Sequence, residues 1–141
     1  MCAAIAHANL DIIERERLVD HVGEHEAAFR GMLESLRDIP IVGDVRGMGH
    51  FFAIEVVKDQ KTREPLTEAE AGWLLKDVMS DRLFERGMIC RLDDRAEPIV
   101  QIAPPLVADM ALFEEITDIL RDGLTHAAER LEAGAPTEVA A

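Results

Sequence analysis

The sequence predicts an α+β domain, in which a small antiparallel sheet of about four strands packs against three to four amphipathic helices. Two observations support this prediction. Apolar residues recur with helical spacing over residues 3–36, 67–86 and 109–131. Short runs of strand-forming residues lie between these segments, at 41–57 and 88–102, and are bounded by Gly and Pro. With 141 residues, of which 48% are hydrophobic, the chain is long enough for one domain with its own core.

The first expected helix, residues 3–14, is apolar around most of its circumference. Ile5, Ala8 and Ile12 share one face, and Leu10 lies beside them. A helix of this kind needs cover on more than one side. We therefore expect it to associate with another surface, and a homo-oligomer, most simply a dimer, is one candidate.

A second helix is expected from Leu18, with a narrower apolar stripe. Its apolar residues repeat in steps of three, four or seven: Leu18, Val22, Phe29, Leu33 and Leu36. Glu26 and Arg30 stand one turn apart, and we expect them to pair on the solvent side of this helix. The stripe predicts a helix that covers one face of the sheet.

Two strands are predicted at residues 41–46 and 50–57, on either side of the glycines of Arg46-Gly47-Met48-Gly49. Alternate residues of the second strand are expected to face the core: Phe52, Ile54 and Val56. The glycines could bring backbone N–H groups close to an anion. We favour a turn or bulge that needs positive φ, because a single R-G-x-G between strands usually serves that purpose.

A third helix is expected to begin at Thr67, since Thr67 and Glu70 have the spacing of a capping box. Its apolar stripe consists of Ala71, Leu74, Leu75, Val78 and Met79. Gly87 is expected to end it, because Gly readily adopts the left-handed conformation that closes a helix.

Two shorter strands are predicted at residues 88–91 and 99–102, separated by an acidic turn at 93–98. Pro104 and Pro105 should end the second strand, because proline has no N–H to donate to a ladder. The turn is expected to be mobile.

A last helix is expected after Asp109, which can cap it. Its apolar stripe consists of Phe113, Ile116, Leu120, Ala127 and Leu131. Residues 133–141 have no periodicity and are expected to form a disordered tail, which leaves 1–132 as the folded domain.

The charge balance excludes two classes of partner. The formal net charge is −13, and the 15 basic residues are scattered among 28 acidic ones. Phosphate backbones and anionic membrane surfaces would be repelled, so we expect binding to neither nucleic acid nor membrane. The N-terminus has no basic region of a secretory signal, and Cys2 and Cys90 form no C-x-x-C pair. Both features favour a reducing, cytoplasmic location.

Four motifs occur in the order found in one known family. They are IVGDVRGMG, the strand end Ile54-Glu55, LFERGMICR and QIAPPL. Together they resemble the C-terminal small domain of class-III (omega) PLP-dependent aminotransferases of fold type I, where the run reads approximately V-R-G-x-G, G-I-E-L, G-x-I-x-R and x-x-P-P-L. Residues 1–17 resemble the helix that leaves the large domain of those enzymes. The resemblance covers roughly residues 2–131.

The resemblance implies amino transfer between an amine or amino acid and a keto acid, with pyridoxal 5′-phosphate as cofactor. In the family, the lysine that holds PLP and the aspartate beside the pyridine nitrogen lie in a large domain upstream. This chain has only Lys58, Lys61 and Lys76, and none has that setting. We therefore expect no catalytic and no cofactor-binding residue here, no transamination by the isolated chain, and a separate PLP-binding large domain as a possible partner.

One functional residue of the family does match this sequence. An arginine at the end of the G-x-I-x-R strand binds the substrate carboxylate in omega-aminotransferases and swings aside for substrates that lack one. Arg91 holds that position in Gly87-Met88-Ile89-Cys90-Arg91. A guanidinium is always charged and matches a carboxylate in bidentate fashion. A structural ion pair with Asp93, Asp94 or Glu55 is the alternative.

Two other functions remain open. The same fold could be a non-catalytic binding or scaffold module that self-associates through its first helix. A remoter alternative is a zinc hydrolase, because His21-Val22-Gly23-Glu24-His25 matches H-x-x-E-H. Gly23 weakens the helix in that motif and no third ligand follows, so we expect no metal site. His7, His50 and His126 are expected at the surface or in packing.

Overall fold

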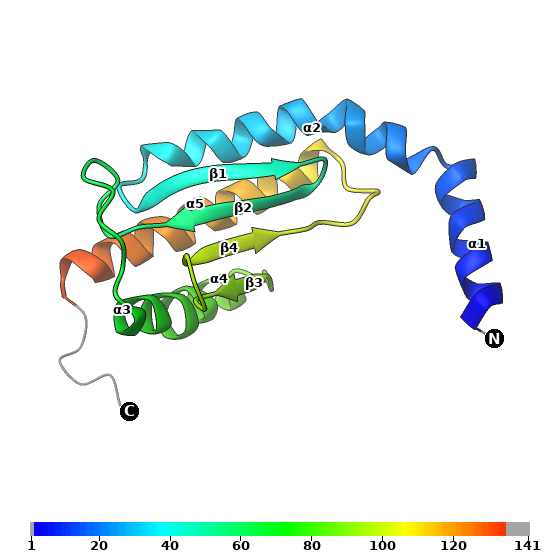
Figure 1. Cartoon of the computed structure of the whole chain (residues 1–141). Helices are drawn as coiled ribbons and strands as arrows, with labels where there is room; N and C mark the ends of the chain where they lie inside the picture. The colour runs from blue at the N-terminus through cyan, green and yellow to red at the C-terminus, as the bar shows by residue number, and fades with distance from the viewer. Residues whose placement is uncertain (1, 135–141) are drawn as a thin grey trace.

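Four antiparallel strands form one sheet, in the order β1-β2-β4-β3, in the computed structural model, which describes residues 2–134. The strands are β1 (Val42–Met48), β2 (Phe51–Val56), β3 (Arg91–Asp93) and β4 (Ile99–Ile102). The helices are α1 (Cys2–Arg15), α2 (Leu18–Glu34), η1 (Ser35–Asp38), α3 (Glu68–Gly72), η2 (Trp73–Met79), α4 (Ser80–Glu85) and α5 (Met110–Glu132). Figure 1 shows α5 behind the sheet, with the other face of the sheet uncovered. The predicted α+β fold is confirmed.

The core lies between the sheet and its helices. Phe52, Ile54 and Val56 of β2 all point inward and are buried, as their alternation predicts. Phe29 of α2 packs edge-on against Phe52, with ring centroids 5.4 Å apart, and stacks on Phe113 of α5 at 4.3 Å. Burial of each ring stabilises the fold by about 1.5–3 kcal/mol. The contacts among the three rings join α2 and α5 to the sheet.

The glycines between β1 and β2 make a tight hairpin, as expected. Met48 pairs with Phe51, so only Gly49 and His50 form the loop, and Gly49 has φ of 60°. Gly47 is needed for another reason. A Cβ at this position would lie 2.2 Å from the carbonyl oxygen of Phe51, so no other residue fits without moving the strand.

Glu26 and Arg30 pair at 3.0 Å as predicted, and their side chains are partly exposed, but both also contact the hairpin between β1 and β2. Glu26 accepts a hydrogen bond from the backbone N–H of Gly49 at 2.9 Å. Arg30 donates to the carbonyl oxygen of Gly47 at 2.6 Å and lies over the ring of Phe52, 4.9 Å from its centroid. The pair therefore fastens α2 to the hairpin.

The third predicted helix begins and ends where expected. The Thr67 side chain accepts from the N–H of Glu70, and the Glu70 carboxylate accepts from the N–H of Thr67, which completes the capping box. At the other end the N–H of Gly87 donates to Phe84 and that of Met88 donates to Leu83. This is a Schellman motif. The π-helical geometry of η2 in the middle was not foreseen.

The predicted strand at 88–91 is displaced. The structure places β3 at Arg91–Asp93, where Arg91 pairs with Gln101. Extending this register would put Met88 opposite Pro104, which has no N–H to donate. Pro104 therefore excludes Met88 from the ladder, which the structure begins at Arg91, and Asp93 belongs to the strand rather than to the turn.

Asp109 caps α5 as predicted, since its carboxylate accepts from the N–H of Leu112 at 3.0 Å. The helix ends at Glu132. Most of the expected disordered tail, residues 135–141, lies outside the described residues. Among residues 2–134, no helix is both long and apolar enough to cross a membrane.

The first helix differs from the others. None of the residues of α1 is buried, and Ile5 and Leu10 are 63% and 56% exposed. Figure 1 shows α1 projecting away from the sheet and its covering helices. It joins α2 through Arg17, which has φ of 51° and makes no side-chain cap. The expectation that one small sheet cannot cover this helix agrees with the structure.

Candidate substrate-binding site

The uncovered face of the sheet carries charged residues in two cross-strand rows. Directly paired residues on adjacent strands point to the same face. The strand pairing therefore aligns one row of Arg46, Ala53, Gln101 and Arg91, and a second row of Asp44, Glu55, Ile99 and Asp93. The first row thus has an arginine at each end, and the second row beside it contains three carboxylates.

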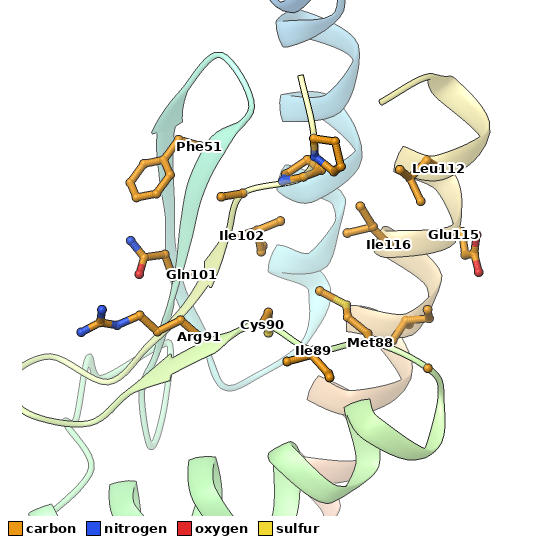
Figure 2. Close-up of a pocket in the computed structure, with 15 residues that line it drawn as sticks. Phe51, Met88, Ile89, Cys90, Arg91, Gln101, Ile102, Leu112, Glu115 and Ile116 are labelled. Carbon is orange, nitrogen blue, oxygen red and sulfur yellow. The ribbon is translucent and has the colours of Figure 1, made fainter. Parts of the chain in front are cut away.

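Arg91 stands at the outer end of the first row. Its side chain is 56% exposed, and Figure 2 shows it projecting to the same side as Gln101 and Phe51. A guanidinium, a carboxamide and an aromatic ring therefore lie in sequence along one edge of the site. These groups suit a carboxylate, a second polar group and an apolar chain, respectively.

Asp93 is the ion-pair partner of Arg91, which confirms one of the three candidates. The Nη2 atom of Arg91 lies 2.9 Å from Oδ2 of Asp93. Glu55 pairs instead with Arg46 at 2.6 Å, and Asp94 pairs with Lys76 at 2.6 Å.

Asp93 also binds a second arginine. Arg95 donates from Nε to Oδ1 at 2.9 Å and from Nη2 to Oδ2 at 2.6 Å. Its backbone N–H also reaches Oδ1, at 3.2 Å. These hydrogen bonds from Arg95, and the further one from Arg91, hold the pKa of Asp93 well below its usual range. The carboxylate therefore stays ionised throughout the physiological pH range.

The acidic turn that follows is more firmly held than its composition suggested. Its Asp94 pairs with Lys76 of η2, and its Glu97 lies 3.0 Å from Arg46 of β1. Pro98 is buried and accepts a hydrogen bond from the backbone N–H of Val56 at 2.8 Å. The turn is thus tied to three elements, and rotation of the Arg91 side chain does not require the turn to move.

A cleft of about 490 Å³ lies beside this row. Its walls include Met88, Cys90, Ile102 and Ile116, with Arg91 at one side (Figure 2). Burial raises the pKa of the Cys90 thiol to about 11, so it is protonated at neutral pH and is a poor nucleophile. The cleft can therefore bind an apolar group, and Cys90 does not act as a nucleophile there.

The lysines of the chain do not fit PLP. All three lie within the described residues. Lys58 is paired with Glu70 at 2.8 Å and Lys76 with Asp94 at 2.6 Å, while Lys61 lies in the exposed loop after β2. PLP needs a lysine for its Schiff base and an anion at the ring nitrogen. None of the three lysines lines the cleft beside Arg91.

The histidines of the H-x-x-E-H sequence contact backbone carbonyl groups. Nε2 of His21 lies 2.9 Å from the carbonyl oxygen of Ala108, and Nδ1 of His25 lies 2.8 Å from that of His21. Glu24 is exposed. Within residues 2–134, no group of three or more His, Cys, Asp or Glu side chains could hold a metal ion. His50 is buried, and burial lowers its pKa.

Three residues of the site were not identified from the sequence. Gln101 comes next to Arg91, and Phe51 comes to the far side of Gln101, only through the sheet register, which sequence reasoning did not supply. The hydrogen bonds of Arg95 to Asp93 had a weak signal, because the two residues are two apart in an acidic stretch. Loop conformation decides whether such residues meet.

Known proteins share both the sequence and the fold. A profile of the family "Aminotransferase class-III" matches residues 1–124. A probable aminotransferase of Mycobacterium tuberculosis is 54% identical over 123 residues, which cover 87% of this chain and 26% of that protein. The putrescine–pyruvate aminotransferase of Pseudomonas aeruginosa is 32% identical over 129 residues, covering 91% of this chain and 27% of that protein.

A solved structure agrees with these relatives. The omega transaminase of Pseudomonas jessenii in complex with PMP superposes with a TM-score of 0.75 at 30% identity, over 90% of this chain and 27% of that one. The present chain thus spans about a quarter of the length of the proteins it matches. The match of the family profile and the shared fold lead to the same conclusion: the chain belongs to the class-III aminotransferase family.

Proposed function

We propose that this chain forms the carboxylate-binding wall of an aminotransferase active site, with Arg91 as the residue that binds the substrate carboxylate. The observation that supports this most strongly is the position of Arg91. Its guanidinium stands half exposed on the uncovered face of the sheet, beside Gln101 and an apolar cleft.

The remainder of the active site belongs to a PLP-binding region outside this chain. The family is PLP-dependent, and the lysines present here are unsuited to the cofactor. When bound, PLP supplies an electron sink for cleavage of bonds at the amine carbon. The part of Arg91 is to bind the carboxylate of a substrate that has one and so to orient that substrate.

We propose that the site accepts two kinds of substrate: amines without a carboxylate, and keto acids, which have one. The Pseudomonas aeruginosa relative is named for putrescine, which has no carboxylate, and pyruvate, which has one. A site that accepts both kinds needs an arginine that can bind a carboxylate and withdraw. Arg91 meets this requirement because it can pair with Asp93 when the substrate has no carboxylate.

A chimera tests the proposal. This chain would replace the matching segment of the Mycobacterium tuberculosis relative, and the activity of Arg91→Ala would be compared with the parent chimera. We expect kcat/KM for carboxylate-bearing substrates to fall about ten- to a hundredfold, since a charge-assisted bidentate pair is lost. Plain amines should be nearly unaffected.

Arg86→Ala is the matched control. Arg86 is 47% exposed and lies 3.9 Å from its nearest carboxylate, Asp122, so this variant loses the same charge away from the proposed site. It should match the parent on both substrate classes. An equal loss on both classes in Arg91→Ala would show that Arg91 is structural.

A second candidate function is a non-catalytic module that associates through α1. The exposed apolar residues of α1 support it, because large exposed apolar patches are uncommon on monomers. Class-III aminotransferases are typically oligomeric, and either a second copy of this chain or a PLP-binding large domain could cover the helix. The expected cytoplasmic location remains a prediction, as does the absence of nucleic acid and membrane partners.

A further inference from the structure

We propose that Asp93 and Arg95 act together as positioning residues that set how readily Arg91 leaves its resting place to bind a substrate carboxylate. The inference rests on the proposed role of Arg91 but concerns different residues. Asp93 is the resting partner of Arg91, and Arg95 weakens the hold of Asp93 on it.

The hydrogen bonds at Asp93 are unequally divided. Oδ1 accepts only from Arg95, through its backbone N–H and its Nε atom. Oδ2 accepts from Arg95 at 2.6 Å and from Arg91 at 2.9 Å. Arg95 thus holds the carboxylate in bidentate fashion, whereas Arg91 makes one longer hydrogen bond to an oxygen that is already occupied.

Because of this division, breaking the ion pair between Arg91 and Asp93 costs little free energy. Asp93 is only 18% exposed, so leaving its charge unpaired would be unfavourable. Arg95 removes that penalty, because it still neutralises Asp93 after Arg91 has moved. Arg95 is itself 73% exposed and makes no contact with the cleft, which leaves it free for this purpose.

Strand pairing and an ion pair hold the backbone on both sides of Asp93, so the movement we propose is that of the Arg91 side chain. Arg91 and Asp93 lie in β3, paired to Gln101 and Ile99 of β4, and the turn beyond is tied to η2 through Lys76 and Asp94. Figure 2 shows the Arg91 side chain extending from the sheet, and its exposed fraction is 56%. Rotation of this side chain can therefore exchange Asp93 for a substrate carboxylate without unfolding the turn.

Two substitutions at this site should act in opposite directions. Asp93→Asn removes the competing charge and should free Arg91. Arg95→Ala leaves Asp93 with Arg91 as its remaining arginine and should hold Arg91 more tightly. A merely structural role for Asp93 predicts instead that both variants disturb the strand and change Arg91 in the same direction.

The test uses the purified chain with ¹⁵N-labelled arginine. Hydrogen exchange of the Arg91 guanidinium, followed by NMR, should be slowest in Arg95→Ala, intermediate in the unmodified chain and fastest in Asp93→Asn. Asp93→Glu should restore slow exchange relative to Asp93→Asn, because it returns the charge. Asp94→Asn, which removes the neighbouring carboxylate, should leave exchange at Arg91 unchanged.

Titration with pyruvate supplies a second measurement. The apparent affinity reported by the Arg91 signal should rise roughly tenfold in Asp93→Asn and fall severalfold in Arg95→Ala. If the exchange order is absent, or both variants shift it the same way, the inference is overturned. If the exchange order holds but pyruvate shifts the Arg95 signals as strongly in Arg91→Ala as in the unmodified chain, the proposed function of Arg91 fails while the role of Asp93 and Arg95 as regulators of its mobility stands.

Discussion

Helix α1 and strand β2 are both rich in apolar residues, yet they differ in how far those residues are buried. β2 buries Phe52, Ile54 and Val56, each with at most 1% of its surface exposed. α1 buries none of its residues. These three residues alternate along β2 and so lie on one face, which a single layer of helices can cover. Those of α1 surround the helix, and the domain has no second layer on that side to cover them.

The comparison shows that apolar content alone does not place a segment in the core. The core of this domain is complete without α1, because α2, α5 and the sheet already enclose the aromatic residues Phe29, Phe52 and Phe113. The apolar surface of α1 is therefore available for association with another protein surface.

The largest expected effect is the difference in unfolding free energy between a substitution in the core and one in α1. Phe113→Ala should lower the free energy of unfolding by about 3–5 kcal/mol, because it empties a fully buried site in contact with Phe29 and His50. Leu10→Ala, at a position 56% exposed on α1, should change it by less than about 0.5 kcal/mol. Denaturant unfolding at concentrations low enough for a monomer would measure both. Comparable losses would mean that α1 is part of the core.

A smaller effect concerns how helices begin. α2 begins at Arg17 without a side-chain cap, whereas α3 begins with the capping box of Thr67 and Glu70. Lys58 and the backbone N–H of Thr67 lower the pKa of Glu70 to about 2. Glu70→Gln should therefore cost about 1–2 kcal/mol at pH 7, a value reduced for partial solvent screening.

The pH dependence of this variant has a definite sign. The folded pKa of Glu70 lies below its ordinary value of 4.5, so the stabilisation is complete above pH 4.5 and is lost as the pH falls toward 2. The difference between Glu70→Gln and the unmodified chain should shrink over that interval. Glu68→Gln, an exposed position in the same turn, is the control. A difference that stays constant down to pH 2 would contradict this account of Glu70.

Most of the fold could be predicted from local patterns. Helical periodicity, the capping box at Thr67, the stop at Gly87 and the cap at Asp109 are all encoded by residues a few positions apart. The displacement of β3 was not, because it depends on how β3 and β4 pair across the sheet. The contacts of Arg30 with Gly47 and Phe52 were also missed, since they join α2 to a hairpin at least 17 residues away.

The site was predictable only in part. The resemblance to a family singled out Arg91, and the structure places this residue on an open, polar surface. It did not reveal that Gln101 lies opposite Arg91, which depends on strand register. Nor did it reveal that Asp93 is shared with Arg95, because that depends on the turn conformation after β3.

The oligomeric state of the purified chain tests most directly whether α1 is an interface. Sedimentation velocity across a dilution series should show a dimer that dissociates on dilution. The double substitution Ile5→Glu and Ile12→Glu should yield a folded monomer, because it places charge on the exposed apolar surface of α1. The matched control for added charge is His7→Glu with Asn9→Glu, which changes two exposed polar residues of the same helix. An unmodified chain that stays monomeric at high concentration would contradict self-association through α1.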